Sequence, residues 1–144
     1  MKHSPAFLRA ALLVSALFVV GLAQAQVAVI VNPKNATATM TADQVSLIFL
    51  GKQTKFPSGA KAQPVDLSEG APARDEFYTK VTGKTAAQVK AAWSKIVFTG
   101  KGQPPKELTS SDDVKKFVAA NPDAIGYIET AAVDGRVKVV LSVD

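Results

Sequence analysis

The segment Val27-Ala28-Val29-Ile30-Val31 is an unbroken run of small and β-branched apolar residues, and Asn32-Pro33 follows it directly. Such a run predicts a β-strand, and the Asn-Pro pair predicts a turn after it. Because the run does not alternate with polar residues, we expect the strand to be covered on both faces. The segment therefore predicts a central sheet covered by helices, which is an α/β fold.

Two helices downstream share one start signal. Thr41-x-x-Gln44 and Thr85-x-x-Gln88 are capping-box patterns, in which the hydroxyl and the amide satisfy backbone N–H groups at the start of a helix. The first of these helices is expected to end at Gly51, since glycine readily adopts the left-handed conformation of a helix end. The second is expected to continue to about Ile96.

The remaining segments complete the order strand, helix, strand, helix, helix, helix, strand, strand. The additional strands are expected at residues 63–67, 124–128 and 137–141, and the additional helices at residues 73–81 and from Ser110 or Ser111 to Asn121. This order predicts one α/β domain with a mostly four-stranded central sheet and about four flanking helices. Trp93 and Phe98 are expected in its core.

Residues 1–25 have the pattern of a cleavable secretory signal peptide. Lys2 and Arg9 supply a basic start, an apolar run follows, and the small-residue triplet Ala23-Gln24-Ala25 ends the segment. The apolar run is shorter than the ~20 residues that a membrane-spanning helix needs. We therefore expect cleavage after Ala25, no membrane insertion of the mature chain, and one domain over residues 26–144.

Composition restricts the chemistry of the mature chain. The sequence has no cysteine, and its one histidine, His3, lies in the expected signal peptide. A thiol nucleophile, a Cys/His zinc site and a Ser-His-Asp triad are thereby excluded, and no acid/base pair is apparent, so we expect neither an enzyme nor a bound cofactor or metal. Lys and Arg number 17 against 12 Asp and Glu, without long blocks of like charge, which argues against nucleic-acid binding.

Several motifs occur in a defined order along the chain. They are Ile48-Phe49-Leu50-Gly51-Lys52, Pro57-Ser58-Gly59, Gln63-Pro64-Val65-Asp66, Arg74-x-x-Phe77, Trp93, Phe98-Thr99-Gly100, Pro104-Pro105 and Ala124-Ile125-Gly126-Tyr127. Together they resemble the periplasmic phosphate-binding protein family of ABC transporters, and more narrowly its small exported relatives that keep one lobe, the PBP-like domain. The resemblance spans about Val27 to Leu141 and implies a type 2 periplasmic-binding-protein lobe, located in the periplasm, with phosphate or another oxyanion as ligand.

The resemblance also places the ligand loop of the family, Arg-x-x-x-Ser-Gly-Thr before a helix, at residues 67–73. A helix start binds anions because its N–H groups lack partners and carry partial positive charge. Here Leu67 takes the arginine position and Ala71-Pro72-Ala73 the Ser-Gly-Thr positions, so both hydroxyls are absent. The residues expected to contact a ligand are Ser68, Gly70, Ala73, Arg74 and Tyr127.

Two functional hypotheses follow. The first is a soluble solute-binding protein that holds an oxyanion or related small ligand weakly, as an isolated lobe or a homodimer. The second is a ligand-free periplasmic interaction module that docks onto a transporter or sensor component of the envelope. For the loop itself, the alternative is an ordinary helix entry in which Ser68 or Glu69 caps the helix and Arg74 faces solvent; for Tyr127, the alternative is a packing role.

Overall fold

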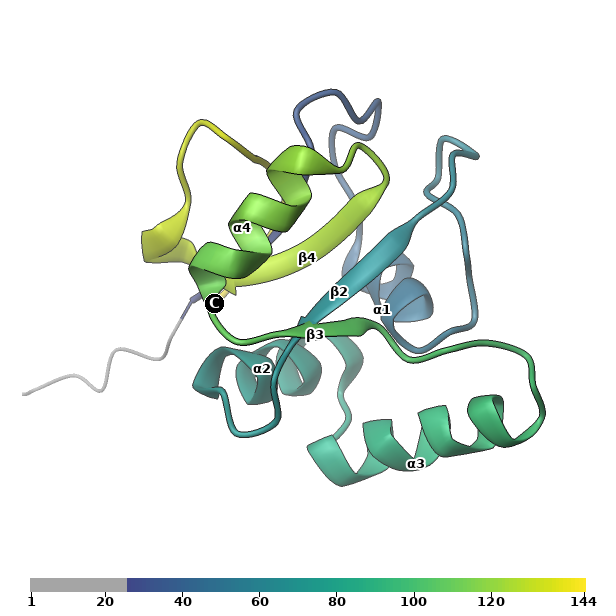
Figure 1. Ribbon diagram of the computed structural model, residues 1–144. Helices are drawn as coiled ribbons and strands as arrows, with labels where there is room; N and C mark the ends of the chain where they lie inside the picture. The colour runs from purple at the N-terminus through teal and green to yellow at the C-terminus, as the bar shows by residue number, and fades with distance from the viewer. Residues whose placement is uncertain (1–25) are drawn as a thin grey trace, which may run out of the picture.

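Strand β1 (Val27–Val31) lies inside a five-stranded sheet of order β3-β2-β4-β1-β5 in the computed structural model, which describes residues 26–144 (Figure 1). The expected signal peptide, residues 1–25, lies outside the described residues. The other strands are β2 (Gln63–Leu67), β3 (Lys106–Leu108), β4 (Ala124–Glu129) and β5 (Lys138–Val143). The helices are α1 (Ala42–Phe49), α2 (Pro72–Phe77), α3 (Ala86–Phe98) and α4 (Ser111–Ala120). The predicted α/β class is confirmed, with one strand more than expected.

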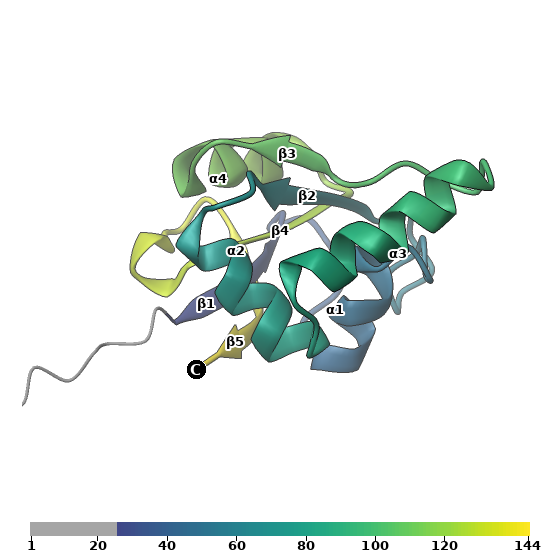
Figure 2. The same ribbon diagram turned by 90° about the horizontal axis from the view of Figure 1, so that it is seen from below.

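The sheet is mixed. Strand β2 pairs in parallel with β3 and β4, whereas β1 pairs antiparallel with β4 and β5. Helix α4 covers one face, and α1, α2 and α3 lie on the other (Figure 2). Every residue of β1 is buried, so the expectation of a strand covered on both faces is confirmed.

The predicted helix starts are confirmed by their hydrogen bonds. The Thr41 hydroxyl accepts from the Gln44 N–H (3.2 Å), and the Gln44 amide oxygen accepts from the Thr41 N–H (3.0 Å). Thr85 and Gln88 repeat this reciprocal pair at α3. These two capping boxes fix the first turns of α1 and α3 from local sequence alone.

Helix α3 is fixed on α1 by its tryptophan. The indole Nε1 of Trp93 donates to the carbonyl oxygen of Phe49 at 3.0 Å. Gly51 follows the end of α1 and has a φ of +73°. A Cβ at this position would lie 2.8 Å from side-chain atoms of both Trp93 and Ile96. Glycine is therefore required at position 51 by its backbone conformation and by the close approach of α3.

The expectation that Phe98 lies in the core is wrong. Phe98 is the last residue of α3, and 92% of its surface is exposed. The helix runs two residues beyond its expected end at Ile96, and Phe98 comes five residues after the buried Trp93. Five residues correspond to about 140° around a helix with 3.6 residues per turn. Phe98 therefore points away from the buried side of α3.

Gly126 in β4 provides a direct test of packing between the sheet and α4. A Cβ at this position would lie 2.7 Å from Cγ1 of Val114 and 3.0 Å from Cγ2 of Val65. We expect Gly126→Ala to lower the free energy of unfolding by about 1–3 kcal/mol through overpacking, measured by urea denaturation. Gly135→Ala is the matched control, because no atom of the described part of the chain lies within 4 Å of its Cβ position. An equal loss in both variants would contradict this account.

Candidate functional site

A buried carboxylate, Asp66, lies next to the end of β2 and organises the polar groups around it. Asp66 is 3% exposed. It accepts hydrogen bonds from the hydroxyl of Tyr127 in β4, from the hydroxyl of Tyr78 (2.5 Å) in the π-helical turn Tyr78–Thr82, and from the N–H of Leu67 (2.9 Å). Three donors thus compensate the desolvation of one carboxylate.

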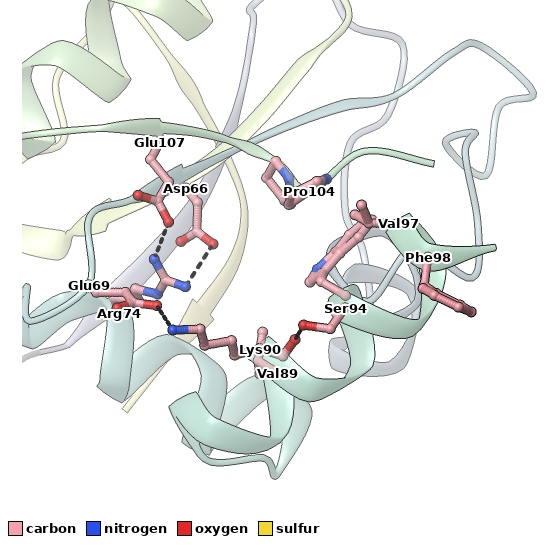
Figure 3. A pocket seen from close by; sticks show the side chains of 12 residues that line it. Asp66, Glu69, Arg74, Val89, Lys90, Ser94, Val97, Phe98, Pro104 and Glu107 are labelled. Carbon is pink, nitrogen blue, oxygen red and sulfur yellow. Dashed lines mark hydrogen bonds and ion pairs between the residues drawn. The ribbon is translucent and has the colours of Figure 1, made fainter. Parts of the chain in front are cut away.

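Arg74, in the first turn of α2, is the positive partner of this cluster. Its Nη1 donates to the Leu67 carbonyl oxygen (2.8 Å) and to Oε1 of Glu107 in β3 (2.9 Å), and its Nη2 lies 4.0 Å from Oδ2 of Asp66. The guanidinium carbon also lies 5.7 Å from the centre of the Tyr78 ring. The arginine therefore connects β2, β3 and α2, as Figure 3 shows for Arg74, Asp66 and Glu107.

Burial dominates the titration of this cluster. Desolvation raises the pKa of Asp66, and the hydrogen bonds from Tyr127 and Tyr78 with the charge of Arg74 offset only part of that effect. Burial and the negative charge of Asp66 raise the pKa of both tyrosine hydroxyls well above its usual value. Both hydroxyls therefore stay protonated at physiological pH and remain donors to the carboxylate.

A small hollow opens at the ends of the parallel strands. It has a volume of about 170 Å³, and we call it the carboxyl-end hollow; its lining residues are Leu67, Ala71, Pro72, Ala73, Thr109, Ser110, Ser111 and Glu129. These residues end β2, lead into α2, connect β3 to α4, and end β4. Open α/β sheets commonly bind ligands outside the carboxyl ends of their strands.

The start of α4 supplies polar groups to this hollow. The Ser110 hydroxyl caps the helix by accepting from the Asp113 N–H (3.1 Å), and the Thr109 hydroxyl donates to Oδ2 of Asp113 (2.8 Å). The first N–H groups of a helix lack intrahelical partners, so those of Ser111 in α4 and of Ala73 in α2 are available donors. Pro72 contributes no N–H group.

The predicted ligand-contacting residues occupy different environments. Ala73 lines the carboxyl-end hollow. The Ser68 hydroxyl donates to the Leu108 carbonyl oxygen (3.3 Å), and Gly70 lies in the turn before α2 with φ +87°. Arg74 and Tyr127 are brought together by Asp66, and both are buried. The hollow therefore gathers one of the five predicted residues, while two others belong to the buried cluster.

The alternative of an ordinary helix entry also differs from the structure. Neither Ser68 nor Glu69 caps α2; its N-cap is Ala71, which makes no side-chain cap hydrogen bond. Arg74 is 6% exposed and does not face solvent. The reason is Asp66, whose buried charge draws the guanidinium inward.

Sequence reasoning missed Asp66, Tyr78 and Glu107. Asp66 carried the clearest signal, because it is an acidic residue inside the otherwise apolar end of a predicted strand. A buried charge almost always has a partner, so Asp66 could have predicted an inward-facing Arg74. Tyr78 and Glu107 carried no comparable signal, since their roles depend on tertiary contacts.

Across residues 26–144, no cluster of three or more His, Cys, Asp or Glu residues is arranged to hold a metal ion. Within the same residues, no helix has the length and apolar character needed to cross a membrane.

No protein-family model and no curated protein matches the chain, but solved structures do. A protein described as a phosphate ABC transporter substrate-binding protein from Clostridium perfringens, solved with bound phosphate, aligns with a TM-score of 0.66 and 26% identity, covering 81% of this chain and 45% of that one. An ABC-type phosphate transport receptor from Vibrio cholerae aligns with a TM-score of 0.63 and 20% identity, covering 81% and 46%. PstS from Borrelia burgdorferi gives a TM-score of 0.60 and 14% identity, covering 81% and 47%.

The chain has the fold of one phosphate-binding-protein lobe. This finding confirms the resemblance inferred from the ordered motifs. The lobe spans less than half the length of the solved structures that it matches, so more than half of each of those proteins has no counterpart in residues 26–144.

The buried carboxylate of the lobe predicts a pH dependence of stability. Because the pKa of Asp66 is higher in the folded than in the unfolded chain, the folded state binds the extra proton between the two pKa values. Ionisation of Asp66 therefore lowers the free energy of unfolding. This loss is absent below the pKa of Asp66 in the unfolded chain, about 3.9, and grows until the pH has passed the pKa of Asp66 in the folded chain. Relative to Asp66→Asn, the wild-type chain should therefore lose stability above about pH 4, by about 1.4 kcal/mol per unit of upward shift.

The measurement is urea unfolding of both proteins from pH 4 to pH 8. Since the other titrating groups are common to both, their contributions largely cancel in the difference between the two free energies. A difference that moves in favour of the wild type as the pH rises would contradict a raised pKa for Asp66.

Proposed function

We propose that the chain is an exported solute-binding lobe that takes a small oxyanion, such as phosphate or sulfate, weakly at the carboxyl-end hollow. The observation that carries this proposal is the position of the hollow, at the carboxyl ends of the three parallel strands β2, β3 and β4. The fold supports binding over catalysis, since the matching solved structures are substrate-binding proteins, one of them holding phosphate.

The charges around the hollow support weak binding. Among residues 26–144, its lining includes one acidic residue, Glu129, and no lysine or arginine. Arg74 is engaged with Glu107 and the Leu67 carbonyl. An anion would therefore depend on hydroxyl and main-chain N–H donors, such as those of Ser110, Ser111 and Ala73, against the repulsion of Glu129.

The hollow is open to solvent on one side, which supports a role for a partner protein that covers it. In this proposal the hollow is closed by a homodimer partner or by a transporter or sensor component of the envelope, because a single lobe leaves a bound ion in contact with water. Exclusion of water strengthens electrostatic contacts, so closure would raise the affinity. The ligand-free interaction module remains the second candidate, and the absence of a basic residue among the residues lining the hollow favours it.

Replacing Glu129 by glutamine tests the anion site. We expect Glu129→Gln to strengthen sulfate binding roughly fivefold, because removal of one negative charge about 5 Å from a dianion relieves on the order of 1 kcal/mol of repulsion. The measurement is thermal shift and calorimetric titration with sodium sulfate and phosphate, against sodium chloride of equal ionic strength.

Asp43→Asn is the matched control, since it makes the same charge change on α1, away from the hollow. If neither the wild type nor Glu129→Gln shows saturable binding of sulfate or phosphate, the solute-binding proposal is rejected in favour of the interaction module.

Export predicts a defined mature N-terminus. Cleavage after Ala25 would leave Gln26 as the first residue, and the carbonyl oxygen of Gln26 accepts from the Thr130 N–H (2.9 Å), directly before β1. The whole of β1 would thus survive processing. N-terminal sequencing of the chain recovered from the periplasm of a bacterial host should read Gln26-Val27-Ala28; recovery of the uncleaved chain in the cytoplasm would contradict export.

A further inference from the structure

A second, larger concavity lies away from the carboxyl-end hollow and shares none of its lining residues. It has a volume of about 440 Å³ and lies between α3 and the strands β2 and β3; we call it the α3 groove (Figure 3). Its lining residues are Asp66, Glu69, Arg74, Val89, Lys90, Trp93, Ser94, Val97, Phe98, Pro104, Pro105 and Glu107. This volume falls in the range of ~300–1,000 Å³ that is typical of small-molecule sites.

The two ends of the groove differ in character. Val97 and Phe98 lie at one end, where 45% and 92% of their surfaces are exposed, and Arg74 with Asp66 and Glu107 lies at the other (Figure 3). Trp93, Pro104 and Pro105 supply flat apolar surfaces to the same lining. Such a surface is suited to a planar apolar body, which stacks on aromatic and proline rings.

Arg74 is incompletely satisfied at the polar end. Within residues 26–144, Nη1 is the one guanidinium nitrogen that makes hydrogen bonds, to the Leu67 carbonyl oxygen and to Glu107. Nη2 points toward Asp66 at the same end of the groove, but the 4.0 Å between Nη2 and Oδ2 is too long for a hydrogen bond. Nε is buried without a partner among the described residues. Arg74 is only 6% exposed, yet two of its guanidinium nitrogens donate no hydrogen bond among the described residues. Unpaired buried donors cost folding free energy unless an acceptor reaches them.

The charge balance defines what that acceptor can be. Asp66 and Glu107 already surround Arg74 with two carboxylates, and Lys90 lies 3.9 Å from Glu69 at the rim. An anionic ligand would be repelled by the carboxylates of Asp66 and Glu107. A cationic ligand would be repelled by the guanidinium of Arg74 and would offer it no acceptor. A neutral acceptor such as a carbonyl oxygen satisfies Nη2 without either penalty.

We propose that the α3 groove binds a neutral planar molecule that carries a carbonyl acceptor, with a carboxamide as the representative class. The carbonyl oxygen accepts from Nη2 of Arg74, and the planar body lies between Trp93, Val97 and the Pro104-Pro105 segment. The site is separate from the anion site and stands whether or not the carboxyl-end hollow binds an oxyanion.

A matched series of probes tests the proposal. 2-Naphthamide, 2-naphthoate and 2-naphthamidine share one ring system and differ in charge, being neutral, anionic and cationic. Binding is measured from the fluorescence of Trp93, the one tryptophan of the chain, and from backbone amide shifts in two-dimensional NMR. We expect saturable binding of the neutral amide, at least fivefold tighter than that of either charged probe. The amide shifts should be confined to Asp66, Glu69, Arg74 and residues 89–98 and 106–107.

Two variants locate the binding. Val97→Ala shortens a side chain that is 45% exposed and lines the groove, so it should fold normally and weaken binding of 2-naphthamide roughly two- to tenfold. Leu47→Ala is its control, because Leu47 is 42% exposed on α1 and outside the groove. Arg74→Lys keeps the charge but removes Nη2, and it should abolish the preference for the neutral probe; its folding is checked by circular dichroism.

The charge series on the wild-type chain decides the matter even if Arg74→Lys fails to fold. Absence of any saturable shift with 2-naphthamide, equal binding of all three probes, or tighter binding of 2-naphthoate would each overturn the proposal. Amide shifts at the carboxyl-end hollow in place of the α3 groove would also overturn it.

Discussion

The arrangement of both concave sites depends on the buried charge of Asp66. Its carboxylate joins the end of β2 to β4 through Tyr127, to the π-helical turn through Tyr78, and to α2 through Arg74. Arg74 in turn reaches β3 through Glu107. Because a buried charge without partners costs several kcal/mol, each of these elements is held close to one point. The carboxyl-end hollow and the α3 groove lie on two sides of that point.

Local signals in the sequence predicted much of the framework. The capping boxes at Thr41 and Thr85 form with both hydrogen bonds, and Ser110 caps α4. These features need only residues three positions apart, so they are readable without a tertiary structure. The strand at residues 27–31 was equally readable, because its continuous apolar character reflects burial on both faces.

The features that the sequence did not reveal depend on contacts between distant segments. Strand β3 is only three residues long, lies at the sheet edge, and reads as part of a proline-containing loop, so no periodicity could mark it. The aromatic side chain of Phe98 favours burial, but its position on α3, about 140° around the helix from Trp93, turns it to solvent. Arg74 and Tyr127 are predicted as ligand contacts, but both side chains are held inside by the carboxylate of Asp66. Asp66 and Tyr127 are 61 residues apart, so only the fold shows that they meet.

The strand that begins the described chain lies between the two strands that end it. β1 takes its hydrogen-bonding partners from residues 125–129 and 138–143, so nearly the whole polypeptide separates the two sides of each pairing. Contacts of such long sequence separation form late, since the closure of a long loop must come first. An incomplete chain has no partners for its most apolar segment. Nascent or truncated forms should therefore stay unfolded and vulnerable to proteases until the C-terminal residues emerge.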